Sequence, residues 1–366
     1  IFIMNICLIG NNLSNLVLAK SLLDKKMNVD LYYKPEIMVT KNTRTIGISE
    51  SNLNFINYSI SNLEKISWPI NEIKVFNDTN QKKPILNFKS KDKKLFSVVK
   101  YDDLFNRLSN LLKKKKNFKK YIIKKNLLYK IKSSKKYDLI INSDKKNSIT
   151  EDHFFNFINK DYNSTAYTTL IKHDYCKNNM AFQIFTKIGP LAFLPLSNNK
   201  TSVVFSAINQ PNNIEDKIIK EYIKKYNINY KINSISKIQK FKLIFSFARK
   251  YYHNNILLFG DALHQIHPLT GQGFNMTMRD IKILLNLIDE QQNLGLPLDK
   301  SLLIKFENKI KHLSFIFASG IDFIHEFFIF DNKLNNSITN NVFKFLDKSN
   351  LFNHHIPNVA NRGIIF

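Results

Sequence analysis

The chain has 366 residues and a mass of 42.9 kDa; 44% of its residues are hydrophobic and 23% are charged. This composition is typical of a folded globular protein and excludes a fibrous or wholly disordered chain. The 55 basic and 29 acidic residues leave a net charge of +26, which has two explanations: a general bias toward lysine, or an affinity for an anionic surface.

The first predicted elements form a β-α-β unit. Asn5–Ile9 is a short apolar run typical of a buried parallel strand, and the apolar residues from Leu16 to Leu23 recur at helical spacing. Val29–Tyr33 is a second strand. The turn between the first strand and the helix covers residues 10–15.

The rest of the chain alternates between strands and helices without a repeat or a long linker, so we expect two interleaved layers. The predicted strands are Ile73–Phe76, Ile85–Phe88, Tyr137–Asn142, several within Thr165–Asn209, and Ile256–Phe259. The predicted helices are Tyr101–Leu112, Ile214–Tyr226, Met276–Ile288 and most of the chain after Ser301. The apolar stretch Leu313–Phe330 contains charged residues, which favours an amphipathic helix over a membrane span.

Charge and cysteine patterns limit the partners and the compartment. The lysines are scattered, and the densest run, Lys113–Lys116, is typical of a solvated helix face or loop, so we do not expect nucleic acid as a partner. The two cysteines, Cys7 and Cys176, lie far apart and indicate a reducing compartment without a disulfide framework.

The segment Gly260–Asn275 carries the strongest chemical signal. It places Gly-Asp at the end of a strand, then a glycine-containing loop, then a helix whose N-terminus can face an electron-rich group. A carboxylate at the strand end can accept hydrogen bonds from sugar or polyol hydroxyls. Taken alone, the segment could also be only a strand-to-helix connection. His264 and His267 lack a third ligand, so we assign no metal site.

The pattern G-D-A-x-H-x-x-H-P-x-x-G-Q-G-x-N-x-x-x-x-D, completed by Asp280, resembles the second flavin motif of the FAD-dependent aromatic hydroxylases, and most closely that of the ubiquinone-biosynthesis hydroxylases. The segment Thr43–Ser49 resembles the family's arginine-containing segment beside the flavin. Gly189–Leu196 resembles its G-P-x-A-x-x-P-L strand in the substrate domain.

The resemblance implies FAD as cofactor and assigns binding roles to particular residues. It implies that Asp261 binds the ribityl chain and that Pro268–Asn275 runs along the flavin ring, where the helix N-terminus stabilises negative charge. The implied cofactor-binding residues are Gly10, Asn12, Asn15, Arg44, Gly260, Asp261, Pro268, Gly271, Gln272, Gly273, Phe274 and Asn275.

The dinucleotide motif departs from the family pattern. The three positions that need glycine are Gly10, Asn12 and Asn15, so the second and third carry side chains near the pyrophosphate path. The family pattern expects an acidic residue at the end of the second strand, but this position is Tyr33. Asp30 lies too early in that strand to replace it. In the family's middle motif, Ser143-Asp144-Lys145, glycine and arginine are missing. These changes leave two interpretations: FAD held mainly by its flavin half, or FAD bound weakly.

With the resemblance, the sequence predicts a mixed α/β fold: a Rossmann-like FAD-binding domain interleaved with an antiparallel-sheet substrate domain and a helical C-terminus. The expected FAD-binding domain comprises residues 1–67, 97–162 and 247–300, and the substrate domain comprises residues 68–96 and 163–246. Residues 301–366 form the expected C-terminal helical segment.

The function that the resemblance implies is hydroxylation of a polyprenylated phenol in ubiquinone biosynthesis. NAD(P)H as co-substrate would reduce FAD, and O2 would form a C4a-hydroperoxide that transfers oxygen to the ring. We name no catalytic residue, because no motif fixes a general base. We expect a cytoplasmic protein that can lie peripherally at the inner membrane or join a quinone-synthesis complex.

Two alternatives remain open. The altered dinucleotide motif is compatible with a non-catalytic lipid-binding or assembly subunit of a quinone-synthesis complex. A different flavin enzyme of the same fold, such as a prenyl reductase or a small-phenol hydroxylase, is a third reading.

Overall fold

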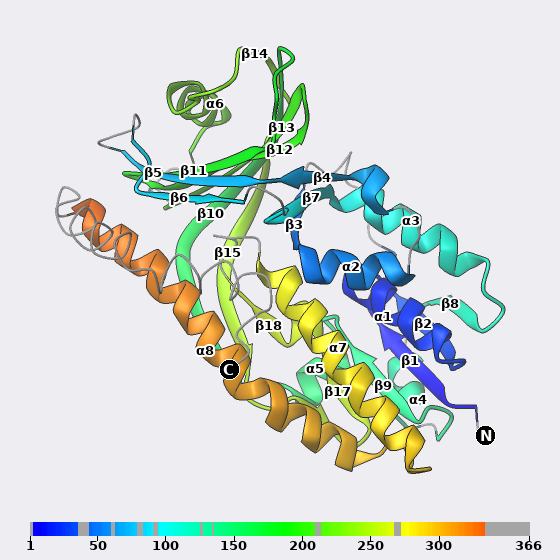
Figure 1. Ribbon diagram of the computed structural model, residues 1–366. Helices are drawn as coiled ribbons and strands as arrows, with labels where there is room; N and C mark the ends of the chain where they lie inside the picture. Colours follow the sequence, from blue (N-terminus) through cyan, green and yellow to red (C-terminus); the bar gives the residue numbers. More distant parts are fainter. Residues whose placement is uncertain are drawn as a thin grey trace.

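The computed structural model describes residues 3–35, 44–59, 63–78, 83–90, 94–124, 127–133, 135–208, 214–266 and 272–333. Within these ranges the strands form three sheets, of which the two larger ones build the two main layers (Figure 1). The mixed α/β fold predicted from the sequence is confirmed.

The first layer is a parallel sheet with strand order β16-β17-β9-β1-β2-β8, in which only β16 runs antiparallel to its neighbour. Its strands are β1 (Asn5–Ile9), β2 (Asn28–Tyr33), β8 (Phe118–Ile122), β9 (Leu139–Asn142), β16 (Tyr252–His253) and β17 (Ile256–Leu258). Residues 6–9 are fully buried, which explains the unbroken apolar run of β1, because a central parallel strand is covered on both faces.

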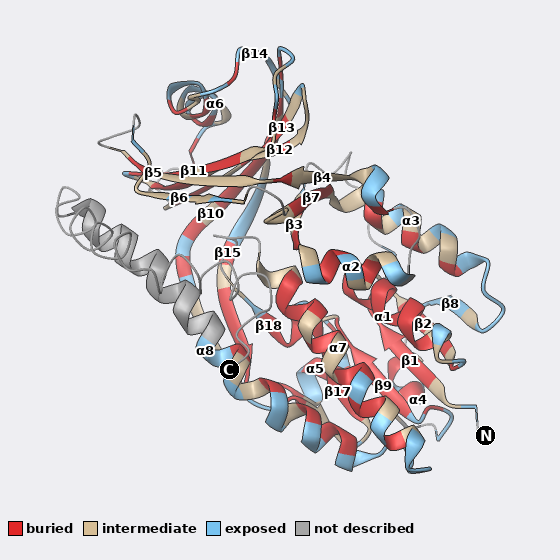
Figure 2. Cartoon of the chain, in the orientation of Figure 1, coloured by how far each residue is buried: buried red, intermediate tan, exposed pale blue. Residues whose placement is uncertain are grey.

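Helices cover this sheet and form a continuous core with it. Figure 2 shows α1 almost wholly buried between its neighbours, whereas α3 and the first half of α8 expose their outer faces. The helices of this layer are α1 (Leu13–Asp24), α2 (Glu50–Ser59), α3 (Tyr101–Lys113), α4 (Leu127–Ser133), α5 (Ser148–His153), α7 (Gln272–Asn293) and α8 (Lys300–Lys333), with the short 3-10 helices η1 (Leu63–Ile66) and η2 (Gly260–Ala262).

The second layer is a mainly antiparallel sheet with strand order β18-β15-β10-β13-β12-β11-β5-β6, and β14 pairs with β10. Its strands are β5 (Glu72–Asn77), β6 (Leu86–Lys89), β10 (Phe157–His173), β11 (Met180–Thr186), β12 (Gly189–Ser197), β13 (Lys200–Ile208), β14 (Ile232–Ile235), β15 (Gln239–Ala248) and β18 (His264–Gln265). Helix α6 (Asp216–Lys225) packs Ile219 and Ile223 into the apolar core of this sheet.

A small antiparallel sheet with order β3-β7-β4 lies between the two layers. It consists of β3 (Thr45–Ser49), β4 (Ser67–Ile70) and β7 (Phe96–Lys100). The long strands β10 and β15 run from the second layer into the first, where the end of β15 pairs with β18 (Figure 1). The expected boundaries at residues 162/163 and 246/247 fall inside these two strands, and the division into domains stays a prediction.

Helix α8 lies in the predicted C-terminal helical segment. It extends to Lys333 and leads away from the first layer. None of the helices in the described ranges is long and apolar enough to cross a membrane.

Candidate functional site

The Gly260–Asp261 step lies where three elements meet. Gly260 has a φ angle of +59° and begins η2 after β17. A Cβ atom added here would lie 3.7 Å from Ser14 Cβ in α1 and 3.7 Å from Thr277 Cγ2 in α7. Glycine therefore lets the chain turn at the junction of α1 and α7 without crowding either helix.

Asp261 follows at the surface of this junction. The residue is exposed, and none of the described residues donates a hydrogen bond to its carboxylate. An ionised carboxylate is an acceptor with two oxygens. Asp261 can therefore accept hydrogen bonds from the hydroxyls of a ligand placed at the junction.

Asn275 joins the start of α7 to two other elements. Its Oδ1 accepts hydrogen bonds from the Ser49 amide at 3.1 Å and from Asn52 Nδ2 at 3.0 Å, and its Nδ2 donates to the Gly47 carbonyl at 2.9 Å. Lys282 Nζ donates to Asn52 Oδ1 at 2.7 Å, and burial lowers the pKa of Lys282. These contacts place the motif beside β3 and α2.

Arg44 lies just before β3 and is connected to α1 through Tyr101. The Arg44 carbonyl accepts a hydrogen bond from the Tyr101 amide at 3.0 Å, and its guanidinium carbon lies 5.1 Å from the centre of the tyrosine ring. The Tyr101 hydroxyl accepts a hydrogen bond from the Leu13 amide at 3.3 Å. No sequence motif predicts Tyr101 as a site residue, because a tyrosine that begins a helix matches no motif.

The loop after β1 contacts the loop after β9. Gly10 has a φ angle of +109°, and a Cβ atom added to it would lie 2.7 Å from Ser143 Oγ. Asn12 caps α1, because its Oδ1 accepts a hydrogen bond from the Asn15 amide at 3.0 Å. Its Nδ2 donates to Ser143 Oγ at 2.7 Å. The first and second motif positions therefore both face Ser143.

The third motif position, Asn15, is fully buried. Its Nδ2 donates to the carbonyls of Ile9 at 3.0 Å and Gly10 at 2.8 Å. Its Oδ1 has no hydrogen-bond partner among the described residues. The side chain thus stabilises the turn after β1 from within, at the place where a third glycine would leave helix and strand in closer contact.

The end of β2 has no acidic side chain at the position that usually binds the ribose of a dinucleotide. Asp30 Oδ2 accepts hydrogen bonds from the Tyr137 hydroxyl at 2.6 Å and from Lys136 Nζ at 2.7 Å. The hydrogen bond to Asp30 raises the pKa of Lys136. Tyr33, at the position of the missing acid, has Lys120 Nζ 4.4 Å from the centre of its ring. Asp30 is therefore engaged with its neighbours.

His264 and Asp280, which both belong to the motif, form a buried pair. His264 Nε2 lies 2.7 Å from Asp280 Oδ2, and both side chains are at most 1% exposed. Arg279 Nη2 lies 2.9 Å from Asp280 Oδ1 and also donates to Ser314 Oγ in α8. In the described part of the chain, no cluster of three histidine, cysteine or acidic residues could hold a metal. The motif histidine thus anchors β18 to α7.

The remaining motif residues lie at or before the start of α7. Gln272, Gly273 and Phe274 begin the helix, and Phe274 packs against the core of the first layer. The predicted site residues Pro268 and Gly271 lie outside the described residues.

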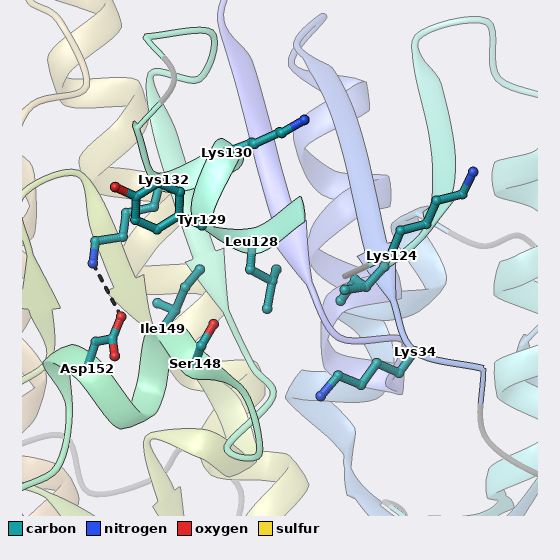
Figure 3. Close-up of a pocket in the computed structure, with 10 residues that line it drawn as sticks. Lys34, Lys124, Leu128, Tyr129, Lys130, Lys132, Ser148, Ile149 and Asp152 are labelled. Atoms are coloured by element: carbon teal, nitrogen blue, oxygen red, sulfur yellow. Dashed lines mark hydrogen bonds and ion pairs between the residues drawn. The ribbon is translucent and has the colours of Figure 1, made fainter. Parts of the chain in front are cut away.

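A hollow of about 720 Å³ opens at the carboxyl ends of β2 and β8. Figure 3 shows Leu128 of α4 near Ser148 and Ile149 of α5, with Lys34 reaching in after β2. Its lining residues are Lys34, Ile123, Lys124, Leu128, Tyr129, Lys130, Lys132, Ser148, Ile149 and Asp152. Only Asp152 is acidic, so this edge of the sheet is cationic. In doubly wound folds, nucleotides bind at this edge.

The described residues fit FAD at the flavin end of the site. At the diphosphate end they depart from the glycine pattern of a dinucleotide motif. The exposed Asp261 carboxylate and the uncrowded turn at Gly260 suit a polyol chain against α7. At the start of α1, side chains occupy the space that glycines leave open to a pyrophosphate.

Comparisons with known proteins agree with the motifs. The family model described as an FAD binding domain matches residues 143–291. The chain is 27% identical over 230 residues to a protein named ubiquinone biosynthesis monooxygenase COQ6 of Drosophila melanogaster. This match covers 51% of this chain and 48% of that protein. It is 29% identical over 158 residues to a protein named ubiquinone hydroxylase UbiM of Neisseria meningitidis, covering 41% of this chain and 34% of that protein. The chain thus spans about half or less of the length of these relatives.

The fold is also that of a solved monooxygenase. The crystal structure of p-nitrophenol 4-monooxygenase PnpA from Pseudomonas putida superposes with a TM-score of 0.77 over 99% of both chains, at 12% sequence identity. At this identity the likeness concerns the fold. Residues 143–291 thus match an FAD binding domain, and among curated proteins the chain is similar to ubiquinone-biosynthesis hydroxylases.

Proposed function

We propose that the chain is an FAD-dependent monooxygenase that hydroxylates the aromatic ring of a polyprenylated phenol in ubiquinone biosynthesis. The observation that carries this proposal is the junction of Gly260–Asp261 with α1 and α7. There an exposed carboxylate adjoins a helix whose first turn is held against β3 by Asn275.

The chain's own residues would bind and orient the cofactor. Asp261 would accept hydrogen bonds from the ribityl hydroxyls, and the turn at Gly10 would lie along the diphosphate. Gln272–Asn275 would present the start of α7 to the electron-rich edge of the ring, where the helix dipole favours negative charge. FAD, when bound, supplies electron transfer from NAD(P)H and the activation of O2.

The overall reaction consumes one O2 and one NAD(P)H per phenol. One oxygen atom enters the ring as a hydroxyl group and the other leaves as water, and the two electrons come from NAD(P)H. The choice of a prenylated phenol is supported by the names of the curated relatives, which are ubiquinone hydroxylases. The protein would also exclude water from the reacting ring.

The visible absorption spectrum of the purified protein tests this function. We expect a yellow protein, or one that becomes yellow with added FAD, whose flavin is bleached by NADH and recovers in air. Asp261→Ala should abolish flavin binding, because it removes the hydroxyl acceptor. Asp174→Ala, which removes an exposed carboxylate directly after β10 of the second layer, is the matched control and should bind like the wild type.

A second candidate function rests on the start of α1. Two of its first-turn amides, those of Leu13 and Asn15, are already bonded to the chain's own side chains. This favours the alternative of a non-catalytic lipid-binding or assembly subunit of a quinone-synthesis complex. A colourless protein that rejects FAD yet binds the prenylated phenol would replace the first proposal with this one.

We also propose a cytoplasmic location with peripheral contact at the inner membrane, where a polyprenylated phenol resides. The net charge of +26 supports contact with an anionic surface. The exposed apolar residues Phe315 and Ile316 of α8 give that surface an apolar component.

A further inference from the structure

The loops that follow β1 and β9 face each other across the switch point of the parallel sheet. Strand β1 has β2 on one side and β9 on the other. In open parallel sheets, ligands bind in the crevice between the loops at such a point. Whatever bridges these two loops therefore controls access to the first turn of α1.

The side chain of Asn12 bridges them. Its Nδ2 donates to Ser143 Oγ at 2.7 Å, with the Ser143 carbonyl at 3.4 Å from the same nitrogen. We call this contact the Asn12–Ser143 bridge. The capping of α1 uses only Oδ1 of Asn12, so capping alone does not require the bridge.

Ser143 is held firmly at its end of the bridge. It is 5% exposed, and its Oγ donates to the Ile9 carbonyl at 3.0 Å. Its amide donates to the same carbonyl at 2.9 Å. Because the serine cannot move away without losing these bonds, the loop after β9 keeps its position against Gly10 and Asn12.

Two amides of the first turn of α1 are already bonded within the chain, one of them to the side chain that forms the bridge. The Asn15 amide is bonded to Asn12 Oδ1, and the Leu13 amide to the Tyr101 hydroxyl. A phosphate would normally accept hydrogen bonds from amides of this turn. To reach the Asn15 amide, a phosphate must first displace the Asn12 side chain and break its bond to Ser143.

We propose that the Asn12–Ser143 bridge determines how tightly this chain takes the diphosphate half of FAD, so that flavin binding depends mainly on the Asp261 side of the site. This inference rests on the proposed function, since it assumes that FAD is the cofactor. The loss of one hydrogen bond of this kind changes an equilibrium constant by about tenfold.

The test measures dissociation constants for three ligands with the 366-residue chain. FAD carries flavin, diphosphate and adenosine, ADP carries the diphosphate and adenosine without the flavin, and riboflavin carries the flavin without phosphate. Flavin fluorescence quenching reports FAD and riboflavin, and calorimetry reports ADP. The variants are Asn12→Gly, which removes the side chain but suits a helix N-cap, and Ser143→Ala, which removes the acceptor of the bridge together with the bond from Ser143 Oγ to the Ile9 carbonyl.

We expect Asn12→Gly to lower the dissociation constants of FAD and ADP by about tenfold, and Ser143→Ala to lower them by about threefold. The constant for riboflavin should not change in either variant. Asn254→Gly is the matched control, because this exposed asparagine has a φ angle of +51° and suits glycine. It should bind all three ligands like the wild type. Thermal unfolding confirms that each variant is folded.

Different outcomes separate the two proposals. If the wild type binds FAD through Asp261 but neither bridge variant binds FAD or ADP more tightly, the role of the bridge is wrong and the proposed function stands. An equal gain for riboflavin would also overturn it, since the bridge would then not act on phosphates. If no variant binds any flavin while ADP gains affinity, the bridge stands and the flavin function fails. No binding of any ligand by any variant overturns both.

Discussion

At the scale of single residues, the candidate site is built on asparagine side chains. An amide donates and accepts hydrogen bonds at once, so one asparagine can join two segments of backbone. Asn12 joins the loops after β1 and β9, Asn15 stabilises the turn from within, and Asn275 joins α7 to β3. By sequence, Asn12 and Asn15 lie in the predicted dinucleotide motif and Asn275 in the predicted flavin motif, yet each has a structural role that requires no ligand.

Asn275 gives the clearest test of such a structural role. Asn275→Ala removes the partners of the Ser49 amide and the Gly47 carbonyl, so it should lower the free energy of unfolding by about 3 kcal/mol. Urea unfolding of the protein without added flavin measures this change. Asn293→Ala, at the exposed end of the same helix, should cost less than about 0.5 kcal/mol. Equal losses in the two variants would show that Asn275 contributes no more to stability than an exposed asparagine of the same helix.

At the scale of elements, the buried carboxylate of Asp280 connects strand β18 with helices α7 and α8. Asp280 in α7 binds His264 of β18 and, through Arg279, is linked to Ser314 of α8. Burial opposes ionisation of Asp280, but the positive charge of Arg279 and the hydrogen bond from His264 outweigh it and lower the pKa of this carboxyl. The ionised form is therefore part of the folded state.

Asp280→Asn should cost about 3 kcal/mol of unfolding free energy at pH 7, because it breaks a buried pair. A lowered carboxyl pKa stabilises the fold above the unfolded pKa of about 3.9 and loses this contribution as the pH falls through the folded value. The difference between wild type and variant should thus shrink below about pH 4. Urea unfolding at pH 7, 5 and 3.5 measures it.

Asp289→Asn is the control, since Asp289 is 44% exposed and pairs with Lys25 at the surface. It should cost less than about 1 kcal/mol at each pH. A cost for Asp280→Asn that does not change between pH 7 and 3.5 would show that its charge contributes nothing to stability.

The elements could be predicted where their apolar pattern is local. The buried run of β1 and the helical stripe of α7 have periods that burial requires, and both elements are present. Helix α7 begins at Gln272, before the predicted Met276, and Asn275 in its first turn bonds to β3. The β3-β7-β4 sheet joins segments distant in the sequence, and no local pattern specifies such pairing. Likewise, the contact of Asn12 with Ser143 joins residues 131 positions apart.

At the scale of the whole molecule, net charge and one exposed helix face combine. Residues 304, 308, 312, 315 and 316 are exposed and recur at helical spacing along the first half of α8. Among them, Ile304 is 40%, Phe315 44% and Ile316 55% exposed. A helix face that exposes three apolar side chains beside Asn308 and His312, on a protein of charge +26, combines the two attractions that hold interfacial helices at anionic bilayers.

Vesicle flotation of the full chain tests this combination. We expect the protein to float with vesicles that contain anionic phosphatidylglycerol and to remain behind with purely zwitterionic phosphatidylcholine vesicles. Raising the salt concentration from about 0.05 to 0.5 M should weaken flotation, because it screens the attraction between the lysines and the lipid head groups. The double variant Phe315→Ser with Ile316→Ser should bind less at both salt concentrations, since it removes only the apolar part.

The control is Tyr175→Ser, which removes an aromatic residue that is 80% exposed in the connection between β10 and β11 of the other layer. It should float like the wild type, because it lies outside the exposed face of α8. If the wild type floats equally with both kinds of vesicle, the charge has no part in membrane contact. If the double variant floats like the wild type, α8 is not the contact surface and the lysines alone hold the protein at the bilayer.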